Sequence, residues 1–478
     1  MARDTAPGDD PSGEAEDDDR LDPSVWKIAA VALFGGLLAQ LDATIVNVSL
    51  SNLAGELHTS LSTIQWITSG YLLALTLVLP LNGWLVGRIG AKALYLWCFA
   101  GFALTSALCG LAWSASSLIA FRVLQGISGG LLAPMAQMMI ARAAGKHMAR
   151  VAGYMVLPVL LAPVLGPVVA GAILQYASWR WLFFVNLPVG ALAFMLAVMF
   201  LPGGREETPR RKLDWVGLAL LSPGLALFLY GSDKIGQTTG RVVLAVGVVM
   251  MAAFLWTARR KGGDALVDLR LFKGAVFSTS AITQFLSNGV QFAGQMLIPA
   301  FLIDACARAP AEMGWMLAPL GLGMMVTYPL MGTLTDRFGI RLVAAGGAFL
   351  TLIATTAFLY LAIHGFDLFV LLPALFFRGM GMSAVGLPSM AAAYASVRKR
   401  DLPMATTSLN IVQRLGGPTL TTLCASFLAW QMGSEVTGHA ASTAYAWAFL
   451  LLCCLHALTA LAATRLPRHL DDVAIQTR

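Results

Sequence analysis

Apolar stretches about as long as a bilayer is thick follow one another along most of the chain. A helix that crosses a membrane needs about 20 mostly apolar residues. Windows of that length predict fourteen membrane spans: 26–50, 63–86, 94–113, 117–141, 151–176, 181–201, 214–231, 241–258, 275–303, 312–334, 342–363, 368–394, 404–430 and 443–464. The pattern therefore predicts an all-α polytopic membrane protein.

The composition supports this interpretation. Hydrophobic residues make up 58% of the chain and charged residues 12%, whereas an ordinary soluble domain has about a quarter of its residues charged. The six cysteines lie mostly within apolar runs and have no spacing that suits zinc, so we expect no metal and no cofactor. Residues 1–23 are acidic and lack an apolar core, which predicts a disordered tail and not a signal peptide.

Basic residues are distributed unevenly between alternate loops. If both termini are cytosolic, the external loops contain few cations, namely Arg180, Lys234, Arg241 and Arg308. The cytosolic loops contain most of the others, as the positive-inside rule requires. This asymmetry indicates a protein of the cytoplasmic (inner) membrane with cytosolic termini. It also accounts for the net charge of +7 without a nucleic-acid partner.

One loop sequence occurs twice. GWLVGRIGAK at 83–92 follows the second predicted span, and GTLTDRFGIR at 332–341 follows the tenth, 249 residues later and without a gap. In each copy glycines stand where a helix must end, and cations stand where the cytosolic surface is expected. Transporters with two six-helix halves are built from parallel repeats of this kind. The spans 214–231 and 241–258 are then two extra helices between the halves.

Four patches together resemble the major facilitator superfamily, and within it the fourteen-helix drug:proton antiporters of the EmrB/QacA type, closer to EmrB. They are LDATIVNVSL at 41–50, the repeated loop, RVLQGISGG at 122–130, and the glycines and proline of 153–171; WRWLFFVNLP at 179–188 adds to the match. The resemblance implies two pseudo-symmetric bundles and this organisation: a cytosolic tail (1–23), an N-terminal six-helix bundle (24–203), basic linkers with two extra helices (204–270), a C-terminal six-helix bundle (271–465) and a second tail (466–478).

The resemblance also implies which residues control the conformational change. The first cytosolic loop of the family usually has an Asp where this chain has Gly87, which weakens the expectation that this loop locks the outward-facing state. The second copy of the loop keeps its acid, Asp336. The Gly166-Pro167 patch is associated with exporters in the family, and a plain kink is the alternative. The residues expected to act in gating are Gly83, Arg88, Gly90, Gly166, Pro167, Gly332, Asp336, Arg337 and Gly339.

Asp42 is the acidic residue placed deepest within a predicted span. It lies fifteen residues after Lys27, about 22 Å along a helix. A carboxylate at that depth is costly, and one that gains and loses a proton can couple protons to transport. A permanent pair with a buried arginine is the alternative. On a helical wheel Asp42 falls opposite a polar stripe, and the sequence leaves open which face lines a cavity; the stripe contains Gln40, Thr44, Asn47 and Ser51.

Three arginines lie within predicted spans. Arg122 matches a family motif whose arginine is implicated in proton movement, with Gln125 beside it as a substrate contact; a hydrogen-bond hub is the alternative. Arg414 lies one turn after Asn410, so both share a face that contacts either substrate or another helix. Arg378 is the third arginine within the spans. This excess of three buried arginines over one buried aspartate favours neutral or anionic amphipathic substrates over dications.

A polar stripe runs along the first span of the second half. Its members are spaced four, three and four residues apart, and lipid would not tolerate such a face: Gln284, Asn288, Gln291 and Gln295. We expect it to contact substrate, with helix packing as the alternative. An apolar wall that accepts many shapes is expected from aromatic and methionine side chains, with Trp66, Tyr71 and Met138 as candidates.

Together these features predict proton-coupled efflux of amphipathic small molecules by alternating access, driven by the proton gradient. A dedicated exporter of one substrate, such as a siderophore, sugar or metabolite, is the first alternative, and a narrow polar site distinguishes it. A membrane receptor or scaffold is the second. No enzyme is expected, because no catalytic constellation is visible. Where the source has two membranes, resemblance to EmrB implies a periplasmic adaptor and an outer-membrane channel as partners.

Overall fold

Helices make up nearly all of the computed structural model, which describes residues 22–203, 212–309, 312–434 and 440–469. Twelve helical stretches of this part are long and apolar enough to cross a membrane; one of them, Ala115–Pro163, joins several helices. The 33-residue helix α20 is a further long element. The described residues contain no strand, and the all-α polytopic fold is confirmed. The predicted tail at 1–23 and the basic linker at 204–211 lie almost wholly outside the described residues.

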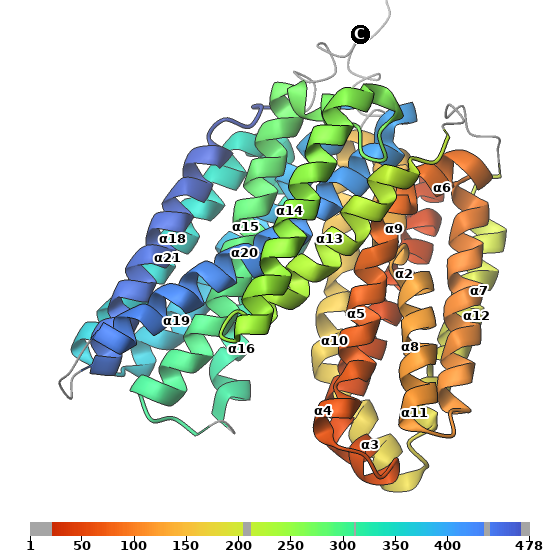
Figure 1. The fold of residues 1–478 in the computed structure, drawn as a ribbon. Helices are drawn as coiled ribbons and strands as arrows, with labels where there is room; N and C mark the ends of the chain where they lie inside the picture. The colour runs from red at the N-terminus through yellow and green to blue at the C-terminus, as the bar shows by residue number, and fades with distance from the viewer. Residues whose placement is uncertain (1–21, 204–211, 310–311, 435–439, 470–478) are drawn as a thin grey trace, which may run out of the picture.

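The first bundle is built from the helices between α2 and α12 (Figure 1). They are α2 (Pro23–Val48), α3 (Leu50–Glu56), α4 (Leu61–Ile64), α5 (Trp66–Val78), α6 (Asn82–Ile89), α7 (Ala91–Gly110), α8 (Ala115–Gly129), α9 (Leu132–Ala144), α10 (Met148–Tyr176), α11 (Trp181–Phe184) and α12 (Asn186–Phe200). The short turn η1 (Leu79–Leu81) joins α5 to α6, so the two form one bent span.

The second bundle repeats this arrangement. Its elements are α15 (Ala275–Ala300), η5 (Phe301–Ala305), α16 (Met313–Thr327), η7 (Tyr328–Leu330), α17 (Met331–Phe338), α18 (Ile340–His364), α19 (Leu368–Ala395), η8 (Lys399–Asp401), α20 (Leu402–Ser434) and α21 (Ala440–Ala463). In both copies of the repeated loop a glycine ends the helix, Gly90 with a φ of +85° and Gly339 with +80°. Only glycine adopts this backbone without strain.

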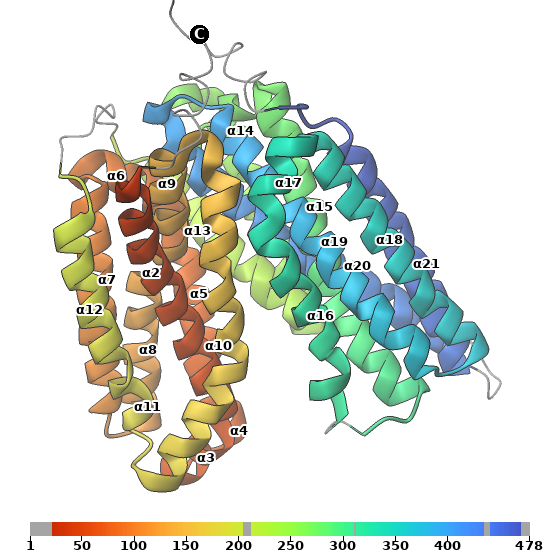
Figure 2. The same ribbon diagram turned by 180° about the vertical axis from the view of Figure 1, so that it is seen from behind.

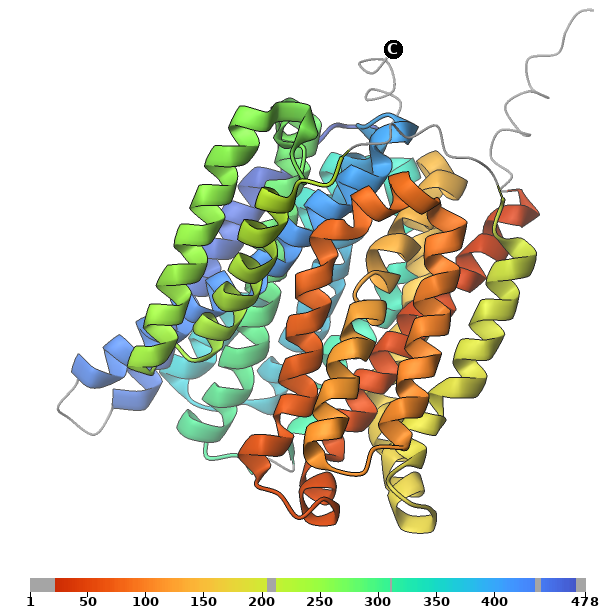
Figure 3. The same cartoon turned by 45° about the vertical axis from the view of Figure 1, so that its right-hand side comes forward.

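Two additional helices, α13 (Trp215–Asp233) and α14 (Thr238–Lys261), form a hairpin between the bundles. Figure 3 shows this yellow-green pair beside the seam, with α13 next to α5 and α20. Asp214 begins the hairpin: its carboxylate accepts hydrogen bonds from the Gly217 and Leu266 amides and from Lys261. Burial raises the pKa of Asp214, but these hydrogen bonds outweigh burial and hold its pKa below the ordinary value.

The two bundles meet at one end and diverge at the other (Figure 2). The end at which they meet, called the closed end below, carries the beginning of α2 and the end of α21. The contacts between bundles that lie there include a hydrogen bond from Asn82 to Thr407 and one from Tyr394 to Gln137. The two bundles are therefore in contact at the closed end and separated at the opposite end.

Candidate functional site

A buried ion pair lies inside the first bundle. Arg122 on α8 donates from Nη1 to Oδ2 of Asp42 on α2 at 2.6 Å, and both side chains are 0% exposed. The same Nη1 also donates to Oε1 of Gln125 at 2.7 Å. Without its partner, either charge would be buried uncompensated, so each holds the other in place.

Amide groups complete the surroundings of the pair. Oδ1 of Asp42 accepts a 2.8 Å hydrogen bond from Asn186 on α12 and a 3.3 Å bond from Gln125. Asn186 also donates to Ser106 on α7, so the network joins α2, α7, α8 and α12. Asn186 was not among the residues predicted from the sequence, although it lies in the run 179–188 that contributed to the family resemblance.

Aromatic rings cover the arginine. The guanidinium carbon of Arg122 lies 4.3 Å from the ring centre of Tyr71 and 5.9 Å from that of Phe183, a cation–π arrangement. Its Nη2 has no hydrogen-bond partner among the described residues. Tyr71, expected on a cavity wall, is instead 2% exposed within the bundle, because it stacks against this cation.

The structure decides which face of the first span is buried. Asp42 points into the bundle, while Gln40, Asn47 and Ser51 of the opposite stripe are exposed. Thr44 packs on α10, where it fills the space that a Cβ at Gly166 would need. Gly166 thus permits the close approach of two helices, and α10 continues through Pro167 to Tyr176.

The second bundle contains a buried arginine that has no acid beside it among the described residues. Arg378 donates to Thr355 Oγ1, to the Val290 carbonyl and, from Nη1 at 3.0 Å, to Nε2 of His456. A guanidinium has no acceptor, so Nε2 of His456 must be the unprotonated nitrogen. Arg378 is therefore held by neutral acceptors, in contrast with Arg122.

A cavity of about 300 Å³ lies at the seam and is lined by parts of both bundles. Three members of the predicted polar stripe, Gln284, Asn288 and Gln291, line it, whereas Gln295 is exposed and lies outside it. Gln284 also contacts α19 through Gly386 and Ser389, and its Oε1 accepts from Gln413 at 2.8 Å. Met138 is fully buried in the bundle core and does not line this cavity.

A larger cavity of about 620 Å³ lies between α5, α13, α15 and α20. Asn410 and Arg414 line it, as does Asn288, which is shared with the smaller cavity. Gln413, which was not among the predicted substrate contacts, also lines both cavities. Trp66, a candidate for the apolar wall, instead stacks on Tyr230 of α13 with ring centres 6.1 Å apart.

An ion pair and a close glycine contact hold one side of the closed end. Arg150 of α10 donates to Asp336 of α17 at 2.7 Å. Gly332 packs so closely on Arg150 that a Cβ would overlap it, and Gly83 occupies the equivalent place against Pro403 of α20, with slightly more room. Arg88 and Arg337, the other predicted cations, are exposed.

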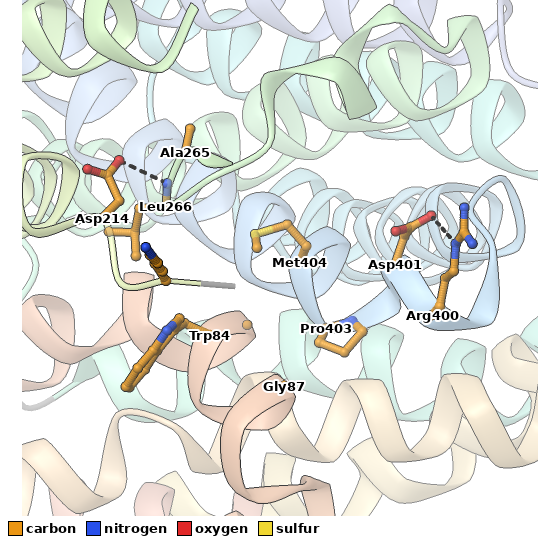
Figure 4. Close-up of a pocket in the computed structure, with 11 residues that line it drawn as sticks. Trp84, Gly87, Asp214, Ala265, Leu266, Arg400, Asp401, Pro403 and Met404 are labelled. Atoms are coloured by element: carbon orange, nitrogen blue, oxygen red, sulfur yellow. Dashed lines mark hydrogen bonds and ion pairs between the residues drawn. The ribbon is translucent and has the colours of Figure 1, made fainter. Parts of the chain in front are cut away.

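On the other side of the closed end, the described residues form no matching ion pair. Gly87 stands where the repeat has Asp336, and a pocket of about 40 Å³ lies between Gly87, Arg400 and Asp214. Figure 4 shows Arg400 beside Asp401 at this pocket, and their side chains are 3.8 Å apart. Among the described residues, the repeated loops thus supply one ion pair between the halves, Arg150–Asp336, where pseudo-symmetry would allow two.

Comparisons with known proteins agree with this architecture. The Major Facilitator Superfamily matches over residues 32–303 and 280–474. The multidrug resistance protein B homolog of Mycobacterium tuberculosis is 32% identical over 91% of this chain and 82% of its own. The putative multidrug resistance protein MdtD of Klebsiella pneumoniae is 29% identical over 95% and 96%. The solved structure of the proton:xylose symporter XylE shares the fold, with a TM-score of 0.65 over 95% and 99% and 16% identity.

Proposed function

Because this chain belongs to the Major Facilitator Superfamily, we propose that this multi-pass transporter exports amphipathic small molecules from the cytosol in exchange for protons. The observation that carries the proposal is the buried Asp42–Arg122 pair, since an intramembrane ionisable pair is costly and is usually retained for function. The names of the two relatives, both multidrug resistance proteins, support drug-like substrates.

The closed end faces the cytosol in this proposal, because both repeated loops and their cations lie there. The conformation described is then outward-facing, with both termini on the cytosolic side of the cytoplasmic membrane. Alternating access requires the Arg150–Asp336 pair to open while the opposite ends of the bundles approach each other. Where a second membrane is present, a periplasmic adaptor and an outer-membrane channel remain partners implied by resemblance alone.

Coupling follows from the electrostatics of the pair. Protonation of Asp42 removes the charge that compensates Arg122, and an uncompensated buried charge costs about 3–5 kcal/mol. Arg122 then relies on Gln125 and on new acceptors for its Nη2, so the contact between α2 and α8 changes. If this change favours the inward-facing conformation, proton binding and substrate release become linked, as exchange requires.

Proton release from proteoliposomes tests this function. Anionic, neutral and cationic amphiphiles are added in turn to the wild type and to Asp42→Asn, with Asp304→Asn as a control for the loss of a carboxylate elsewhere. We expect release from the wild type and the control only. Since Asp42→Asn strands Arg122, the neutral double variant Asp42→Asn/Arg122→Gln is measured as well. Normal substrate-driven proton release from that folded variant would contradict coupling by the pair.

A further inference from the structure

The larger cavity at the seam contains a cation without a counterion. Arg414 of α20 lines it and has neither a hydrogen bond nor an acid within salt-bridge distance among the described residues. The other cations within the spans differ, since Asp42 pairs with Arg122 and neutral acceptors hold Arg378. A guanidinium within a membrane span requires an anion, carbonyl groups or water.

Two polar side chains without partners among the described residues line the same cavity. Thr421 lies two turns further along the same face of α20, and its hydroxyl is buried without a hydrogen-bond partner among the described residues. The amide of Asn288 reaches the cavity from α15 and likewise makes no hydrogen bond to the described protein. By contrast, the amides of Asn410 and Gln413 are already engaged by Gln137 and Gln284.

The inserted hairpin supplies the fourth wall of the cavity. Tyr230 of α13, Phe292 of α15 and Leu72 and Leu73 of α5 line it. The stacked Trp66 side chain fixes the Tyr230 ring, and a contact from Thr422 to the Ser232 carbonyl ties α13 to α20. The cavity lining therefore combines apolar and aromatic side chains with one arginine.

The one acid that lines the cavity lies away from the arginine. Asp233 pairs with Lys234 at 3.3 Å, and its side chain is 71% exposed. The contact between Ser232 and Thr422 places this acid beside a position eight residues beyond Arg414 on α20, about 12 Å along the helix axis. Asp233 therefore does not neutralise Arg414.

We propose that this cavity binds an amphiphile with one anionic group on a ring-containing body, the anion on Arg414 and Asn288 and the rings against Tyr230 and Phe292. This inference rests on the proposed export function and assigns part of the substrate site to the inserted helix α13. The charge-assisted hydrogen bonds of a guanidinium favour a carboxylate, sulfonate or phosphate over a neutral group of the same shape.

A matched pair of fluorescent probes tests the site. Binding of 4-(1-pyrenyl)butanoate and of its primary amide to the detergent-purified full chain is followed by tryptophan-to-pyrene energy transfer. We expect the wild type to prefer the acid, and Arg414→Gln to bind the acid about ten- to a hundredfold more weakly with little change for the amide. Arg414→Lys should restore part of the preference, while Tyr230→Ala should weaken both probes alike.

The control variant is Lys234→Gln, which removes the cation that pairs with Asp233 beside the same cavity and should leave both affinities unchanged. Equal affinity of the wild type for acid and amide, or acid binding by folded Arg414→Gln at wild-type strength, overturns the proposal. Competition by phosphatidylglycerol, but not by phosphatidylcholine, supports the anion site and identifies a lipid headgroup as an occupant. The binding assay needs no proton gradient, so the two proposals can fail separately. Absence of an anion preference would contradict this site but not proton-coupled export, and absence of proton release would contradict proton-coupled export but not this site.

Discussion

Gly294 occupies on α15 the position that Asp42 occupies on α2, nineteen residues after the first residue of a 26-residue helix. The Arg378 guanidinium packs directly against Gly294 and leaves no room for a Cβ. The two bundles thus place an arginine against the same position of their first helices, but only the first bundle supplies an acid. This asymmetry assigns the ionisable pair to one half of a pseudo-symmetric molecule.

Replacement of Gly294 by alanine should destabilise the protein, because the new methyl group must displace the buried Arg378 side chain. Overpacking of this kind costs about 1–3 kcal/mol. Thermal unfolding in detergent measures the effect. The matched control is Gly346→Ala on α18, where nothing lies within 4 Å of the new Cβ; equal melting temperatures for the two variants would show that Arg378 moves aside freely.

The free energy of unfolding of variants should show how far Asp42 and Arg122 stabilise each other. Asp42→Asn strands a buried guanidinium and should cost about 3–5 kcal/mol, whereas the double variant Asp42→Asn/Arg122→Gln removes both charges and should recover much of the loss. Denaturation of both variants and of Arg122→Gln gives the coupling energy of the cycle. Strict additivity of the two single changes would mean that the pair does not interact in the folded protein.

A second ion pair at the closed end should shift the conformational equilibrium. Gly87→Asp places a carboxylate at the pocket beside Arg400 and should favour the conformation described here, while Asp336→Asn removes the existing pair with Arg150 and should disfavour it. Each exposed pair contributes about 0.2–1 kcal/mol. Pulsed EPR between labels at positions 89 and 338, in a cysteine-free background, should report a larger closed fraction for the first variant. Equal distance distributions in both would be the contrary result.

The two glycines that line the closed end should differ in their tolerance of a side chain. A Cβ at Gly332 overlaps the Arg150 side chain, whereas a Cβ at Gly83 lies 3.2 Å from the nearest atom, the Pro403 carbonyl oxygen. Gly332→Ala should therefore open the closed end and slow transport more than Gly83→Ala. Transport rates and the same EPR distances test the order of the effects, and a reversed order would refute this explanation.

Asp214 should make the hairpin sensitive to acid. Its pKa is lowered in the folded protein because hydrogen bonds from Lys261 and two backbone amides outweigh burial. A lowered folded-state pKa gives stability that is present above the unfolded-state value and is lost as the pH falls through the folded-state value. The difference in melting temperature between wild type and Asp214→Asn should therefore shrink below about pH 4; a difference that stays constant from neutral to acid pH would contradict this.

Local features of the sequence predicted the helices well. The spans could be predicted because a helix that crosses a bilayer needs about 20 apolar residues in a row. The turn glycines at 90 and 339 could be predicted because a backbone with positive φ favours glycine. The polar stripe on α15 could be predicted because its residues recur at helical spacing within one short segment. Three of its four members line a cavity. The placement of Tyr71 and Met138 inside the first bundle was not visible, since both residues suit a cavity wall and a core equally well.

The sequence by itself determined where the apolar helices lie, the repeat and the presence of a deep acid, because each of these depends on residues close together in the chain. Only the tertiary structure decided that Asp42 meets Arg122, 80 residues away, and Asn186, 144 residues away. It also decided that α13 joins α5 and α20 around Arg414. The sequence of a membrane helix does not say which of its faces will line a site. Packing against helices that are distant in the chain decides this.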